Sequence, residues 1–142
     1  MGYASFSLAM ALGRFGGDWV RARVAPVRLM MYSGALGALG MTAALVVPVE
    51  DVALVGFALV GLGMSNVVPV LFSAASKIPG VAPAHGIAAV SGMGYLGIMA
   101  GPPMIGFVAE HSSLTVGLGC VVLFAIFMAL AAPRALKSAA PV

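Results

Sequence analysis

The chain has 142 residues, of which 62% are hydrophobic and only 8% are charged. A water-soluble domain usually carries about 25% charged residues, so this composition excludes an ordinary soluble fold. The net charge of +3 would suit nucleic acid, but the basic residues follow the membrane pattern described below, and no nucleic-acid partner is expected. With Cys120 as the one cysteine, neither an internal disulfide nor a cysteine-rich metal site is predicted.

Four long stretches without charged residues run through the sequence. The first, between Arg28 and Glu50, holds 21 residues. A hydrocarbon core of about 30 Å needs roughly 20 apolar residues in a helix, so each stretch is long enough to cross a membrane. We therefore predict an all-α, polytopic transmembrane helix bundle, whose last helix should end at Pro133. The full spans are expected at about 29–48, 52–75, 87–108 and 114–133.

The first apolar piece, residues 1–13, is too short to cross a membrane alone. At about 1.5 Å per residue it covers roughly 20 Å as a helix. We interpret it as a truncated span, so the whole sequence, residues 1–142, is expected to be one membrane domain belonging to a larger unit. The expected partner is a missing N-terminal half or another chain.

Charged residues alternate between the two ends of the predicted bundle. All seven Lys and Arg fall in 14–28, in 76–86 or in the tail from Arg134. Three of the four acids fall in 48–52 and 109–113. Because basic loops of membrane proteins face the cytoplasm, we predict a multi-pass protein of the inner or plasma membrane with a cytoplasmic C-terminus.

The first informative segment, residues 13–23, reads Gly-Arg-Phe-Gly-Gly-Asp-Trp-Val-Arg-Ala-Arg. Glycines let backbones approach closely, and an acid beside several arginines can form ion pairs that hold helices together in one conformation. The alternative is that the arginines only set the orientation in the membrane. The candidate residues of a conformational latch are Gly13, Arg14, Gly17, Asp18, Arg21 and Arg23.

The second segment, residues 61–73, places Asn66 deep within a predicted span. An amide in the membrane needs a partner, because an unpaired polar group is costly to bury there. Asn66, Pro69 and Ser73 follow i, i+3, i+7 spacing, which predicts one helix face, and Pro69 frees a backbone carbonyl one turn earlier. This face could line a solute cavity, or Asn66 could instead hydrogen-bond a neighbouring helix.

The third segment, residues 92–107, is rich in glycine and proline. Its glycines include a pair spaced by four residues, which allows helices to touch backbone to backbone, and its two prolines predict a kink. The candidate packing and kink residues are Gly97, Gly101, Pro102, Pro103 and Gly106. Ser91 and Tyr95, spaced i, i+4, are further candidates for a solute cavity.

These segments resemble parts of the major facilitator superfamily (MFS) of transporters. Gly-Arg-x-x-Gly-Asp at 13–18 resembles the loop between helices eight and nine, and Gly-Pro-Pro-x-x-Gly at 101–106 resembles the end of helix eleven. The Gly-rich start and Asn-x-x-Pro core of 61–73 resemble helix ten of the fucose-permease-like branch. The resemblance implies a partial MFS fold, helices eight to twelve, acting in secondary-active transport by alternating access as the C-terminal part of a transporter.

The spans contain no Asp, Glu, Lys or Arg, which weakly favours a neutral solute. The sequence shows no phosphate loop and no catalytic or metal-ligand set, so no enzyme activity, cofactor or metal is expected. The expected partners are the lipid bilayer and a small-molecule solute. The alternative is a non-transporting small membrane partner or scaffold, or an inactive remnant of a transporter.

Overall fold

The computed structural model describes residues 1–138, which form seven helices without a strand. Four helical stretches are long and apolar enough to cross a membrane, so the predicted all-α transmembrane bundle is confirmed. The helices are α1 (Gly2–Phe15), α2 (Gly17–Arg21), α3 (Pro26–Val46), α4 (Glu50–Met64), α5 (Val67–Ala75), α6 (Pro83–His111) and α7 (Leu114–Ser138).

Local sequence signals explain where these helices begin. Pro26 and Pro83 occupy the first turns of α3 and α6, where the missing amide would have had no helical partner. Glu50 and Asp51 lie in the first turn of α4, at the positive end of the helix dipole. Gly80 turns the chain between α5 and α6 with a φ of 75°, a conformation that side-chain-bearing residues rarely adopt.

Pro133 does not end the last helix, so that expectation is wrong. Helix α7 continues to Ser138 with Pro133 in its interior. Proline removes one amide donor and crowds the carbonyl four residues earlier, here that of Ala129. A membrane helix tolerates this loss where a neighbour and small local adjustments satisfy the backbone, and α7 packs along α3.

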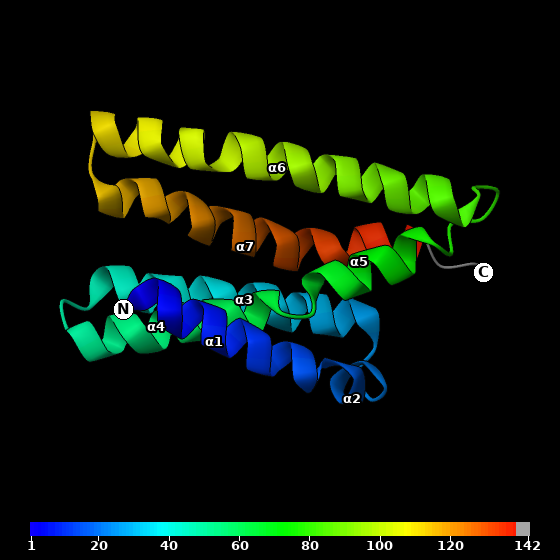
Figure 1. Ribbon diagram of the computed structural model, residues 1–142, viewed down its shortest axis with the longest axis horizontal. Coiled ribbons are helices and arrows are strands. Elements are labelled where there is room, and N and C mark those ends of the chain that lie inside the picture. Colours follow the sequence, from blue (N-terminus) through cyan, green and yellow to red (C-terminus); the bar gives the residue numbers. More distant parts are fainter. Residues whose placement is uncertain (139–142) are drawn as a thin grey trace.

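Helix α3 is the centre of the packing, because it contacts both α4 and α7, while α1 packs against α4. Helix α6 lies outermost, next to α7 (Figure 1). Glycines make the close contacts possible: a Cβ on Gly40 would lie 2.6 Å from the carbonyl oxygen of Gly56, and one on Gly61 would lie 3.0 Å from the carbonyl carbon of Phe6. Such backbone contact is what stabilises helix pairs in lipid.

The connections between helices alternate between the two ends of the bundle (Figure 1). The segment with α2, the α5–α6 turn and the end of α7 share one end, and the α3–α4 and α6–α7 turns share the other. The first, here called the basic end, therefore carries the basic segments. The second carries Glu50, Asp51 and Glu110.

The second span is broken at Ser65 and Asn66, between α4 and α5. Pro69 explains the break, because it has no amide hydrogen to donate and its ring crowds the carbonyl of Ser65, four residues earlier. Helix α5 leaves the line of α4 and runs towards the start of α6 (Figure 1). The break also lets the side chain of Asn66 meet a neighbouring element.

Candidate functional site

The segment that contains α2 packs directly on the break in the α4–α5 span. A Cβ on Gly13 would lie 2.6 Å from Ser65 Oγ, and a Cβ on Gly17 would overlap Asn66 Oδ1. A side chain at either position would force Ser65 or Asn66 to shift, so the two glycines allow the close approach. The close approach removes the break from solvent, leaving Ser65 1% and Asn66 7% exposed.

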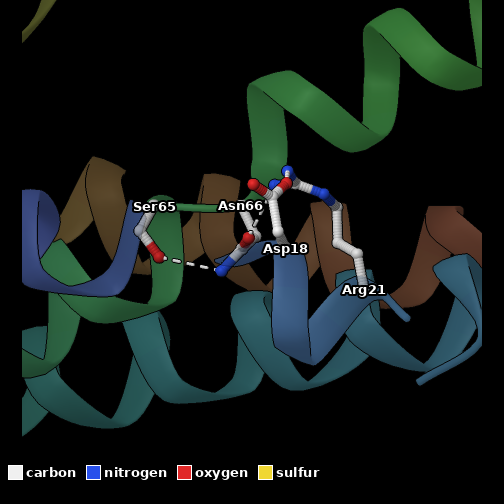
Figure 2. Close-up of polar contacts among 4 residues, drawn as sticks. All are labelled: Asp18, Arg21, Ser65 and Asn66. Atoms are coloured by element: carbon white, nitrogen blue, oxygen red, sulfur yellow. Dashed lines mark hydrogen bonds and ion pairs between the residues drawn. The ribbon is translucent and has the colours of Figure 1, made fainter. Parts of the chain in front are cut away.

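A chain of hydrogen bonds joins this segment to the break (Figure 2). Arg21 Nη1 donates to Asn66 Oδ1 at 3.0 Å, while Arg21 Nη2 is paired with Asp18 Oδ1. Asn66 Nδ2 donates to Ser65 Oγ at 3.1 Å, and Ser65 Oγ donates to the carbonyl of Leu62 at 2.7 Å. We call the bond between Arg21 and Asn66 the latch. Throughout residues 1–138, no buried side-chain nitrogen or oxygen lacks a partner.

The remaining basic residues of the predicted latch segment lie elsewhere. Arg23 stacks over the Trp19 ring at 3.9 Å and donates to the Trp19 carbonyl at 3.3 Å. Arg14 is exposed in the last turn of α1. In the described part of the chain, no hydrogen bond or ion pair joins Arg14 or Arg23 to the break. The structure thus brings three of the six predicted latch residues against the break, namely Gly13, Gly17 and Arg21, and a fourth, Asp18, is joined to them through Arg21.

The predicted cavity residues do not gather in one place. Asn66 is buried in the latch, Pro69 is half-buried in α5 and Ser73 is exposed. Ser91 and Tyr95 lie on α6, where Tyr95 is 69% exposed. Asn66 and Ser73 therefore belong to one span but meet different surroundings, and both are separate from the α6 pair.

Predicted residues line two hollows of the bundle. One, of about 450 Å³, lies between the α2–α3 segment, α5 and α7, and includes Arg21, Ser73 and Lys77 in its wall. The other, of about 460 Å³, lies between α6 and α7, and its largely apolar wall includes Gly97 and Gly101. Neither includes Asn66. Residues 1–138 hold no group of three His, Cys, Asp or Glu side chains placed to bind a metal ion.

The candidate packing residues of α6 face open space within the described chain. A Cβ on Gly97, Gly101 or Gly106 would have no atom within 4 Å. Pro102 and Pro103 lie inside α6, which is helical from Pro83 to His111. The close contacts of α6 are made instead by Gly86, beside the carbonyl of Ala75, and along α7.

Sequence reasoning missed the roles of Ser65 and Lys77. Ser65 stands four residues before Pro69. A proline disrupts a helix at the carbonyl of that position, so the spacing could have predicted that Ser65 lies at the break. For Lys77, the sequence predicts only a contribution to the orientation in the membrane. Lys77 lines the same hollow as Arg21 because of the direction that α5 takes after the break (Figure 1). That direction cannot be predicted from a short stretch of sequence.

The sequence is similar to curated membrane proteins over nearly its whole length. It is 42% identical over 133 residues to an uncharacterised MFS-type transporter of Yersinia pestis, covering 93% of this chain and 34% of that protein. It is 44% identical over 126 residues to the membrane protein MosC of Rhizobium meliloti, covering 89% and 30%. It is 30% identical over 133 residues to an uncharacterised transporter of Sinorhizobium fredii, covering 94% and 35%.

The chain therefore spans about a third of the length of the curated relatives it matches. No family model and no solved structure matches it. Two of the three relatives are named as transporters, and four apolar helices in this chain are long enough to cross a membrane. The chain is a multi-pass membrane protein related to transporters.

Proposed function

We propose that this chain works as the C-terminal part of an MFS transporter, helices eight to twelve, which moves a small solute by alternating access. The observation that carries the proposal is the latch, which joins the α2 segment to a broken span. Similarity to an MFS-type transporter over 93% of the chain supports it. Assignment to the fucose-permease-like branch stays a prediction from the Asn-x-x-Pro core at 66–69.

Alternating access requires parts that move about hinges and are held in one arrangement at a time. The break at Ser65 and Asn66 is a point where α5 can change direction relative to α4, because no continuous helix joins them. A hydrogen bond to a charged group contributes about 1.5–3 kcal/mol, which is enough to bias two arrangements but not to prevent exchange. We propose that the latch closes in one transport state and opens in another.

For the solute, we propose a neutral molecule carrying hydroxyl or amide groups. The spans lack Asp, Glu, Lys and Arg, which supports an uncharged ligand. Ser91 and Tyr95 on α6 are the proposed contact residues, whereas Ser73 lines the separate hollow that includes Arg21 and Lys77. The bonds that Asn66 makes to Arg21 and Ser65 favour its role between elements over a role in touching the solute.

Asp18→Asn in the whole transporter is expected to reduce uptake about 2- to 13-fold, the equivalent of the ~0.5–1.5 kcal/mol of one hydrogen bond. The change removes the charge that orients Arg21 towards the break. The Asp18 side chain is 92% exposed, so folding and membrane insertion should be unchanged. The solute is first identified by comparing metabolite pools of expressing and non-expressing cells, and uptake is then measured per inserted molecule.

The matched control is Glu110→Gln, which removes an acid at the opposite end of the bundle and should leave uptake unchanged. If the Asp18→Asn variant takes up solute normally, the latch has no role in transport, and the arginines of this segment only set the orientation in the membrane.

The orientation is tested by cysteine labelling with a membrane-impermeant maleimide. In a Cys120→Ser background, Glu50→Cys is expected to react in intact cells, because basic segments stay in the cytoplasm and position 50 lies at the other end. Lys77→Cys is expected to react only after permeabilisation. Labelling of position 50 from the cytoplasmic side alone would reverse the proposed topology.

A further inference from the structure

We propose that the hollow between the α2–α3 segment, α5 and α7 binds an anionic phospholipid, with the phosphate beside Arg21 and Lys77. The inference concerns lipid recognition and does not depend on whether the chain transports a solute. It rests on the charges, the apolar walls and the position of this hollow.

The charges in the hollow are all positive. Arg21 and Lys77 line it, no acidic side chain does, and within residues 1–138 Lys77 makes no ion pair. The guanidinium of Arg21 has five N–H donors, of which one is used by Asn66 and one by Asp18, so donors remain for a phosphate oxygen. Ser73 adds a hydroxyl to the same wall.

The rest of the wall is apolar and suits an acyl chain. Val24, Val27 and Leu136 line the hollow together with Leu29 and Val70 of the buried core. The volume of about 450 Å³ is more than a free phosphate ion fills. An inorganic anion would leave these side chains facing water, whereas a hydrocarbon chain removes apolar surface from water.

The hollow lies where a membrane presents its phosphates. Helix α3 begins at Pro26 and α5 ends at Ala75, so the lining residues stand where the apolar spans meet the basic end of the bundle. Phospholipid phosphates lie at this boundary, with acyl chains running along the spans. Basic pockets between membrane helices on the cytoplasmic side are known to take anionic headgroups.

The test is native mass spectrometry of the purified 142-residue chain in detergent, titrated with phosphatidylglycerol and separately with zwitterionic phosphatidylcholine. We expect tighter binding of phosphatidylglycerol, weakened about fivefold by Lys77→Gln, since one cation near the membrane surface contributes that much. Binding of phosphatidylcholine should not change. Arg28→Gln removes an equal charge from the same end without altering the hollow, and should change the affinity less than twofold.

Two further arms decide between this site and its alternatives. Equal losses in Lys77→Gln and Arg28→Gln would show attraction by overall charge and overturn the proposal. Millimolar inorganic phosphate is expected not to displace the lipid, and displacement would assign the site to a free anion. Ser73→Leu, at an exposed position, should narrow the hollow and weaken binding with helix content retained, and undiminished binding would place the lipid elsewhere.

Discussion

Gly61→Ala is expected to lower the free energy of unfolding of the bundle by about 1–3 kcal/mol, the usual effect of forcing extra volume into a packed interior. A Cβ at this position would overlap the carbonyl oxygen of Phe6 and lie 3.1 Å from the amide nitrogen of Met10. Both atoms belong to the backbone of α1, which cannot rotate aside as a side chain can. Helix α1 would therefore have to move away from α4, its main packing partner.

The measurement is thermal unfolding of the purified chain in detergent, followed by helical circular dichroism. Gly97→Ala is the matched control, because a Cβ there would meet no atom within 4 Å in the described residues. Alanine is a better helix former than glycine by about 1 kcal/mol, so the control should unfold at the same temperature or slightly higher. If both variants unfold alike, α1 does not pack on α4 through Gly61.

The predictions that the structure confirms rest on properties that short stretches of sequence carry. Twenty apolar residues are enough to cross a bilayer whatever surrounds them, so the four spans could be read directly from the chain. The alternation of basic and acidic segments along the chain likewise predicts which helix connections share an end of the bundle, and the structure places them so (Figure 1). Pro133 shows the limit, since whether a proline ends a helix depends on the packing around it.

Glycine contacts could not be assigned from sequence alone. The spacing of Gly97 and Gly101 shows that a helix could approach there, but not that a partner is available, and within residues 1–138 none is. Gly40, Gly56 and Gly61 make the close contacts instead. Which glycine meets a neighbour depends on the rotation of each helix in the bundle, which is a property of the whole packing.

The members of the latch were predictable from the sequence, but their pairing was not. Asp18, Arg21 and Asn66 each stood out, because charges and amides near a membrane need partners. Their pairing did not, because Arg21 and Asn66 are 45 positions apart and no periodicity connects them. Pro69 carried the one signal that could have joined the two segments, since the break it causes frees Asn66 to face another element.

Asn66→Ala is expected to lower the free energy of unfolding by about 1.5–3 kcal/mol, the range for a hydrogen bond to a charged group. The substitution removes the acceptor for Arg21 Nη1 and the donor to Ser65 Oγ, which is 1% exposed. Arg21 would then keep only its pair with the exposed Asp18. Stability is measured by thermal and denaturant unfolding in detergent.

A double-mutant cycle separates the latch from general loss of packing. Arg21→Ala and Asn66→Ala together should cost less than the sum of the single changes, with a coupling energy of about 0.5–3 kcal/mol. Arg23→Ala is the matched control in the same segment, because Arg23 stacks on Trp19 and has no bond to Asn66. Its effect should add to that of Asn66→Ala within about 0.5 kcal/mol.

The same variant decides what Asn66 does in transport. If the latch is its role, Asn66→Ala reduces stability, and the substrate constant measured per folded molecule stays unchanged in the whole transporter. If Asn66 instead touches the solute, that constant rises about 2- to 13-fold, the equivalent of ~0.5–1.5 kcal/mol for a bond to an uncharged group, and stability is retained. The bonds from Asn66 to Arg21 and Ser65 favour the first result. If the substrate constant rises and the double-mutant cycle gives no coupling energy between Arg21 and Asn66, Asn66 contacts the solute and the latch assignment is wrong.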